Sequence, residues 1–171
     1  MQGFVQVYTG DGKGKTTAAL GLAVRAAGAG LRVYIGQFIK NADYSELTAL
    51  QGLAGAITIE QYGLGCMLVQ APTGEDILAA RRGLAAIDAA LASGAFDLVV
   101  ADEINVACAL GLLAEGDLLG LMERRPPEVE LVLTGRGAPV AVLERADLVT
   151  EMRPVKHYYQ RGVAARKGIE G

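Results

Sequence analysis

Short apolar segments alternate along the chain with longer segments that are rich in alanine and leucine. Six of the short segments are predicted to be β-strands, because most are continuous and β-branched rather than alternating. The expected strands are Phe4–Tyr8, Arg32–Phe38, Ala56–Gln61, Leu98–Ala101, Glu130–Leu133 and Leu148–Glu151. Continuous apolar strands are typical of a parallel sheet that is covered on both faces.

The longer segments between these strands have the spacing of helices. The expected helices are Lys15–Gly28, Glu46–Leu53, Gly74–Ser93, Asn105–Leu113, Gly116–Arg124 and Pro139–Arg145. In the longest one, Gly94 is expected to form the C-cap, and large apolar residues fall near one stripe. This stripe consists of Ile77, Leu78, Leu84, Ile87 and Leu91. The alternation of strands and helices predicts a doubly wound α/β sheet with ligands at the carboxyl ends of its strands.

Composition and charge narrow the class of protein. The 171 residues suffice for one α/β domain, and the absence of a linker, repeat or low-complexity tract predicts a single domain over residues 1–171. A net charge of −3 offers no basic face for nucleic acid. The chain has two cysteines, Cys66 and Cys108, without a CxxC pair or a Cys/His cluster, so we expect small packed core residues rather than a zinc ribbon or disulfide framework.

The opening residues MQGFVQVYTG resemble a strand and have neither the basic region nor the cleavage site of a signal peptide. Apolar runs are interrupted well short of the roughly 18 residues that a membrane span needs. We therefore expect a cytoplasmic protein with no nucleic-acid or membrane partner.

The strongest chemical signal is the segment Thr9–Thr17 (TGDGKGKTT), which lies between an expected strand and an expected helix. Its glycines let backbone N–H groups face an anion, the helix directs its positive end there, and Lys15 adds a charge. Thr16 is placed to ligate Mg²⁺ through its hydroxyl. The segment departs from the pattern G-x-x-x-x-G-K-[ST], because Thr9 replaces the first glycine and Gly10 lies one residue closer. The expected ATP-binding residues here are Gly10, Asp11, Gly12, Lys13, Gly14, Lys15, Thr16 and Thr17.

Two carboxylates, Asp102 and Glu103, follow the buried strand that begins at Leu98. In phosphate sites an acidic residue at this place holds Mg²⁺ or its water. Taken alone, the pair is equally consistent with an N-cap, in which Asp102 caps the helix at Asn105. The phosphate loop upstream favours metal binding and leaves the direct ligand open between the two.

The turn Thr134–Gly137 (TGRG) also follows an expected strand. Its arginine, Arg136, is therefore placed to reach the phosphates, and the alternative is a turn with a solvated arginine.

Together with their flanking residues, these elements resemble one family, the P-loop type ATP:corrinoid adenosyltransferases, which act on cob(I)alamin or cob(I)yrinic acid a,c-diamide. The resemblance covers the chain from end to end, with only residues 41–95 fitting loosely. The segments that carry it are Thr9–Gly30, Val33–Lys40 (VYIGQFIK), Asp97–Asn105 (DLVVADEIN), Arg125–Pro139, Ala146–Met152 and Lys156–Glu170 (KHYYQRGVAARKGIE). A generic NTPase would share the loop and the acidic strand end, but not the QFIK, TGR and KH…GIE blocks.

The resemblance implies a P-loop NTPase (RecA-like) fold and a homodimer with Mg·ATP in the loop, the nucleotide lying reversed so that its 5′ carbon faces the corrinoid. It also implies that Co(I), supplied by an electron donor such as a reduced flavoprotein, attacks that carbon and that triphosphate leaves. Because Co(I) is itself a strong nucleophile, no side-chain base is required. Lys15 and Arg136 are the expected catalytic residues, since they would stabilise charge on the leaving triphosphate together with Mg²⁺ and Lys13. For His157, a structural or dimer-contact role is expected.

One segment departs from the family. Where the family often has Gly-x-Gly-Phe-x-Trp, whose aromatic residues help to displace the lower ligand of the corrinoid, this chain has Gly63–Leu68 (GLGCML). Cys66 and Leu68 replace the aromatic pair, so either an apolar wedge with Met67 persists or the segment is an altered packing loop. A non-catalytic corrinoid or nucleotide sensor, or another P-loop ATP-using enzyme, therefore remains an alternative.

Overall fold

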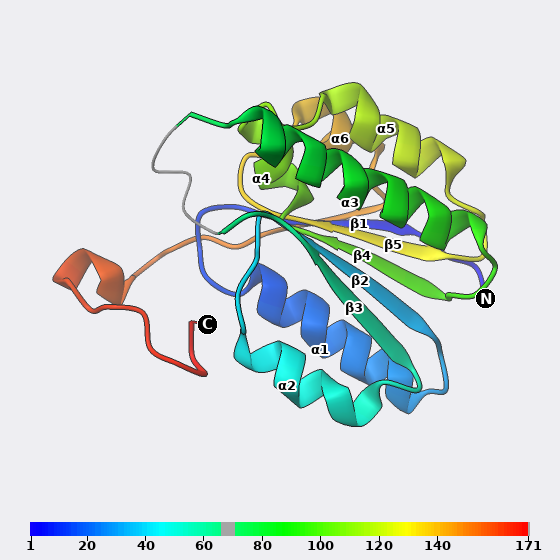
Figure 1. Cartoon of the computed structure of the whole chain (residues 1–171), viewed down its shortest axis with the longest axis horizontal. Coiled ribbons are helices and arrows are strands. Elements are labelled where there is room, and N and C mark those ends of the chain that lie inside the picture. Colours follow the sequence, from blue (N-terminus) through cyan, green and yellow to red (C-terminus); the bar gives the residue numbers. More distant parts are fainter. Residues whose placement is uncertain (66–70, 171) are drawn as a thin grey trace.

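The six expected strands form one parallel sheet (Figure 1). The computed structural model describes residues 1–65 and 71–170. The strands are β1 (Val5–Thr9), β2 (Val33–Phe38), β3 (Ile57–Tyr62), β4 (Leu98–Asp102), β5 (Glu130–Thr134) and β6 (Leu148–Glu151). Their order is β3-β2-β4-β5-β1-β6, and every neighbouring pair is parallel. The predicted mostly parallel, six-stranded α/β architecture is confirmed.

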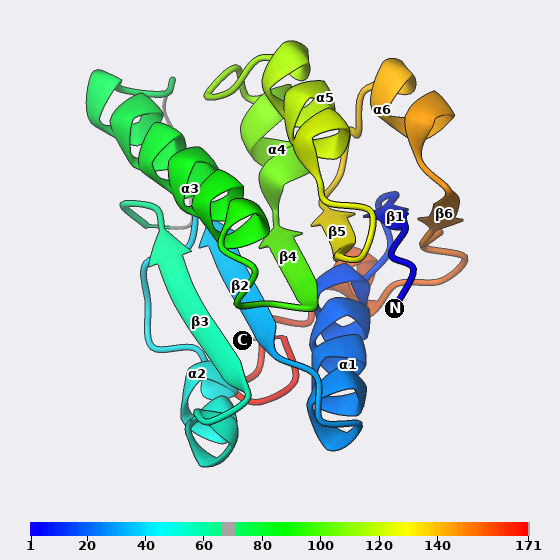
Figure 2. The ribbon, with the colours of Figure 1, turned by 90° about the vertical axis from the view of Figure 1, so that its right-hand side faces the viewer.

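Helices cover both faces of the sheet (Figures 1 and 2). Figure 1 shows α1 and α2 on one face and α3, α4, α5 and α6 on the other. The helices are α1 (Lys15–Gly28), α2 (Ser45–Leu50), α3 (Gly74–Ala92), α4 (Ile104–Ala109), α5 (Glu115–Arg124) and α6 (Val140–Arg145), with short 3-10 helices at Gln51–Leu53 and Tyr158–Arg161. Most expected bounds agree within one or two residues. The helix expected to reach Leu113 instead ends at Ala109, because the N–H groups of Leu112 and Leu113 both bond back to the carbonyl of Ala107.

The core lies in two layers, one on each face of the sheet. The layer beneath α3–α6 contains Phe38, Ile87, Leu118 and Leu133, all fully buried. The other layer forms where the alanine-rich face of α1 packs on the sheet, and small residues let this helix approach the strands closely. Cys108 is half-buried and packs against the first layer as expected, whereas Cys66 lies outside the described residues.

The apolar stripe expected along α3 is wrong in its first half. Ile87 and Leu91 are buried, but Ile77 is 39% exposed and Leu78 is 60% exposed. At this end the helix meets the sheet through small residues instead. A Cβ atom on Gly83 would lie 2.8 Å from side-chain atoms of Phe38 and Tyr62, so there is no room for a large residue. The buried small residues are Ala79, Ala80 and Gly83.

Because all the strands are parallel, their carboxyl ends share one end of the sheet. Residues that are distant in sequence meet there: Gln37 pairs with Asp102, and Tyr8 pairs with Thr134. Figure 1 shows the tail beyond β6 running past this same end. Within the described residues, no helix has the length and apolar character to cross a membrane.

Candidate nucleotide site

The glycine-rich segment forms a loop between β1 and α1. Gly10 and Gly14 have φ angles of 92° and 119°, in the left-handed region that favours glycine. The loop also lies directly on the segment after β6, because the N–H of Gly12 donates to the carbonyl of Met152 at 2.6 Å. A Cβ on Gly10 or Gly12 would lie 2.5 or 2.7 Å from that carbonyl oxygen. These glycines therefore allow both the turn itself and its close contact with the segment after β6.

The Lys15 side chain folds over this loop. Its ammonium donates to the carbonyls of Gly10 and Gly12, both at 2.7 Å. Burial, followed by repulsion from Arg136, lowers the pKa of Lys15. Burial and a neighbouring cation both disfavour the charged ammonium, and an anion bound in the loop would favour it.

Asp102, at the end of β4, is the centre of a hydrogen-bond network. Thr16 and Thr134 donate their hydroxyls to its Oδ1 at 2.8 and 2.7 Å. Gln37 and Lys40 donate to its Oδ2 at 3.2 and 3.0 Å. The carboxylate is 1% exposed, and these donors come from α1, β5, β2 and the residues after β2. Asp102 thus ties the glycine-rich loop to its neighbouring strands.

The interpretation of Asp102 as a helix cap is wrong. The N-cap residue of α4 is Glu103, and no side-chain cap hydrogen bond is present. Glu103 has a φ of 62°, unusual for a residue with a side chain, and its N–H donates to the Thr134 hydroxyl at 2.9 Å. Its carboxylate lines the adjacent cavity, and burial followed by the charge of Asp102 raises its pKa.

A cavity of about 920 Å³ opens above the loop, a size typical of small-molecule and cofactor sites. The sequence-predicted residues that line it are Gly12, Lys13, Gly14, Lys15, Thr16, Thr17, Glu103 and Arg136. Gly10 and Asp11 do not line it, and Asp102 lies behind Thr16, to which it is bonded. The structure therefore brings most of the predicted phosphate-site residues to one cavity.

The C-terminal tail also reaches this cavity, with His157 and residues 168–170 in its wall. The Nδ1 atom of His157 accepts a hydrogen bond from the N–H of Tyr159 at 3.1 Å. Glu170 bonds to Tyr158 and to Arg166, whose guanidinium lies 5.0 Å from the centre of the Tyr158 ring. The KH…GIE block thus contributes to the wall of the candidate site.

Sequence reasoning assigned no role to Gln37, Lys40 or Thr134, although all three contact Asp102. Gln37 offered a signal, since it is a polar residue in an otherwise apolar strand and is fully buried. Lys40 follows the end of the same strand. Gln37 and Lys40 can be connected with Asp102 only if β2 is known to lie beside β4. Strand order does not follow from local sequence.

The described residues contain no cluster of three His, Cys, Asp or Glu side chains that would bind a metal by themselves. Thr16, Asp102 and Glu103 instead offer hard oxygen atoms beside the glycine-rich loop. This donor set fits Mg²⁺, which usually binds one or two carboxylates together with phosphates and water.

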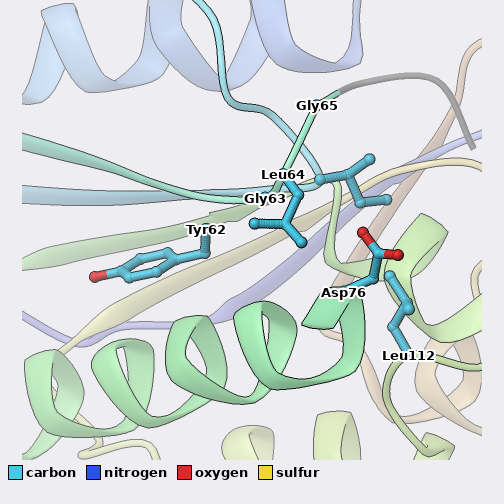
Figure 3. A pocket seen from close by; sticks show the side chains of 7 residues that line it. Tyr62, Gly63, Leu64, Gly65, Asp76 and Leu112 are labelled. Carbon is cyan, nitrogen blue, oxygen red and sulfur yellow. The ribbon is translucent and has the colours of Figure 1, made fainter. Parts of the chain in front are cut away.

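A much smaller pocket, of about 10 Å³, lies at the carboxyl end of β3 and has room for about one water molecule (Figure 3). The ring of Tyr62 points away from Asp76 and Leu112 in this view. The pocket also includes Ile39, Gly63, Leu64 and Gly65. The expectations for Cys66, Met67 and Leu68, which follow directly in sequence, lie outside the described residues.

Comparison with known proteins identifies the family. A family model described as ATP:corrinoid adenosyltransferase BtuR/CobO/CobP matches residues 1–171. A corrinoid adenosyltransferase of Pseudomonas aeruginosa is 35% identical over 170 residues, which cover 99% of this chain and 84% of the relative. A corrinoid adenosyltransferase of Escherichia coli (strain K12) is 35% identical over 99% of this chain and 86% of the relative. An uncharacterized protein of Nostoc sp., all2391, is 37% identical to this chain. The aligned region covers 92% of this chain and 45% of that longer protein. The chain belongs to the ATP:corrinoid adenosyltransferase BtuR/CobO/CobP family.

Proposed function

We propose that this protein transfers the 5′-deoxyadenosyl group of ATP to Co(I) of a corrinoid and releases triphosphate, in adenosylcobalamin biosynthesis or salvage. The corrinoid is cob(I)alamin or cob(I)yrinic acid a,c-diamide. The observation that carries the proposal is the convergence of the glycine-rich loop and Arg136 at one large cavity, with Asp102 bonded to Thr16 behind it, in a chain of this family.

The cations around the cavity suit a triphosphate leaving group. Lys13, Lys15 and Arg136 all line it, and the N-terminus of α1 begins at the loop. Their charges would offset the negative charge that grows on the leaving oxygen as the bond to carbon breaks. Lys15 is bound to loop carbonyls and would exchange these for phosphate oxygens.

Mg²⁺ is part of the proposal. The Thr16 hydroxyl and the Glu103 carboxylate line the cavity, and Asp102 holds Thr16 in place from behind. These residues would hold the ion, which supplies charge neutralisation on the triphosphate when it is bound. The raised pKa of Glu103 agrees with a carboxylate that lacks sufficient positive charge nearby, which a bound cation would provide.

The remaining parts of the proposal follow from the family resemblance. Co(I) needs no activating base, so the protein's task is to align the cobalt with the 5′ carbon. An electron donor such as a reduced flavoprotein would supply the reduced corrinoid. We also propose a homodimer that works in the cytoplasm.

The test is an anaerobic spectrum of the purified protein with Mg·ATP and chemically generated cob(I)alamin. The proposal requires loss of the Co(I) band and growth of a light-sensitive product in excess over protein, with triphosphate released only when Co(I) is present. If Co(I) persists, the measurement is repeated with cob(I)yrinic acid a,c-diamide. Failure with both corrinoids contradicts the proposal. ATP binding without turnover would then indicate a sensor, and phosphate release without corrinoid an ATPase.

A further inference from the structure

Lys40 places a buried cation at the wall of the candidate site. Its ammonium lies 3.0 Å from Oδ2 of Asp102 and 3.5 Å from Oε1 of Glu46, and its side chain is only 14% exposed. The ring centre of Tyr44 lies 5.1 Å away. The ammonium is therefore paired with two carboxylates rather than with solvent.

The backbone before Lys40 is held in a strained turn. Ile39 is β-branched and has a φ of 67°, a region that such residues rarely adopt. Gly63 packs against this turn so closely that a Cβ there would lie 2.2 Å from the carbonyl oxygen of Ile39. Strain of this kind persists only where its surroundings impose it, and here it directs Lys40 towards the site.

Asp102 has no acceptor position to spare. A carboxylate offers about four lone-pair sites, and those of Asp102 are used by Thr16, Thr134, Gln37 and Lys40. Another cation, or its water, can bind Asp102 only after one donor has left. Gln37 and Thr134 are completely buried. Thr16 is held in the first turn of α1 and can keep donating to Asp102 while its oxygen faces the metal, whereas the flexible Lys40 side chain lines the cavity. Lys40 is therefore the donor that is free to exchange.

We propose that Lys40 is a positioning residue that changes partner when nucleotide binds. Without nucleotide its ammonium balances the charge of Asp102. With Mg·ATP bound it moves to a phosphate oxygen and leaves Oδ2 of Asp102 to the water shell of the metal. The exchange makes metal binding and phosphate binding depend on each other. This inference rests on the proposed function, because it requires Mg·ATP as the ligand.

The first measurement is ATP binding by isothermal titration calorimetry, without corrinoid and over a series of Mg²⁺ concentrations. In Lys40→Met the affinity at saturating Mg²⁺ should fall about tenfold, because one charge-assisted contact to phosphate is lost. Lys40→Arg keeps the charge and should recover most of the affinity. Arg82→Met removes an exposed charge from α3 and is the matched control, which should bind ATP like the wild type.

The second measurement follows Mn²⁺, as a substitute for Mg²⁺, by electron paramagnetic resonance in the absence of ATP. Wild-type protein should bind Mn²⁺ weakly, because Lys40 occupies Asp102. Lys40→Met and Lys40→Gln should bind it about tenfold more tightly or better, since they lack the ammonium that competes for the carboxylate. A lysine with a merely structural role would not produce this gain. Lys40→Gln carries the test if Lys40→Met is too unstable to purify, because its neutral amide is polar at the cavity wall and places no cation on Asp102.

Unchanged Mn²⁺ binding in both neutral variants would overturn the inference, whether or not their ATP affinity falls, because the exchange requires both effects. Failure of the proposed function appears separately. In that case the wild-type protein itself binds no Mg·ATP or transfers no adenosyl group, before any variant is compared.

Discussion

Two carboxylates in this sheet accept hydrogen bonds from several side chains, yet their surroundings differ. Asp102, at the end of β4, receives donors from four residues and one of these, Lys40, is a cation. Glu60, in β3, lies within hydrogen-bonding distance of the hydroxyls of Tyr34 and Tyr62, whose oxygen atoms are also 2.7 Å apart. Both clusters hold neighbouring strands together.

The difference lies in charge and in what is nearby. The network of Asp102 contains a cation and adjoins a cavity with three further cations, Lys13, Lys15 and Arg136. Glu60 is exposed, is bonded to neutral hydroxyls and does not line that cavity. A carboxylate whose hydrogen bonds are all made thus indicates a binding site only when cations without a counter-charge lie beside it. We expect the cluster at Glu60 to be structural.

Lys15→Ala should have the largest effect on activity. The ammonium that lies over the loop would be lost, and turnover should fall by about 10²–10³-fold or more, because charge on the leaving triphosphate is no longer offset. Circular dichroism and the thermal midpoint should stay close to wild type. The measurement is Co(I)-dependent release of triphosphate. Retained activity would show that the loop does not act in catalysis. It would also contradict the view that Asp102, unlike Glu60, belongs to a functional site.

Asp102→Asn tests the pairing of Asp102 with Lys40, and the quantity that reports it is the free energy of unfolding. The substitution leaves Lys40 as a buried cation without its main partner, which should lower the free energy of unfolding by about 3 kcal/mol and also reduce turnover. The measurement is urea denaturation monitored by circular dichroism. Adding Lys40→Met to this variant should recover part of the lost stability, because the unpaired charge is then removed. A double variant as unstable as the sum of the two single variants would contradict the pairing.

The parts of this site that the sequence predicts are the local ones. The glycine-rich loop and the helix Lys15–Gly28 were predicted with the bounds that the structure has, because turn residues, strand and helix occur in one continuous segment. Asp102 and Arg136 were predicted to lie at strand ends, and both do. Such signals need no knowledge of which strands are neighbours.

The parts that were missed depend on tertiary contacts. Lys40 meets Asp102 only because β2 lies beside β4, although β3 is the next strand along the chain. The stripe on α3 was wrong because Ile77 and Leu78 lie where small residues let the helix approach the sheet. Helical periodicity predicts a buried face, but it does not reveal how closely that face approaches its neighbour.

Arg136→Ala should have a smaller effect on activity than Lys15→Ala. Arg136 is exposed in the turn after β5 and lines the cavity from one side, so turnover should fall about tenfold while the fold is unaffected. Steady-state kinetics with varied ATP measures the effect, which should appear in kcat if the arginine acts on the leaving group. A change confined to KM would assign Arg136 to ground-state binding instead.

Glu60→Gln should have the smallest effect, and it tests the other half of the comparison. Turnover should stay at the wild-type level, and stability at neutral pH should fall by less than about 1 kcal/mol, because solvent screens an exposed carboxylate. Hydrogen bonds from Tyr34 and then Tyr62 lower the pKa of Glu60, so its stabilising effect is present above the unfolded value of about 4.3 and is lost as pH falls through the lower folded value. Denaturation of both proteins between neutral and acidic pH measures this difference, which should shrink on acidification. A loss of turnover in Glu60→Gln with stability unchanged would place this cluster in the functional machinery and break the distinction between the two carboxylates.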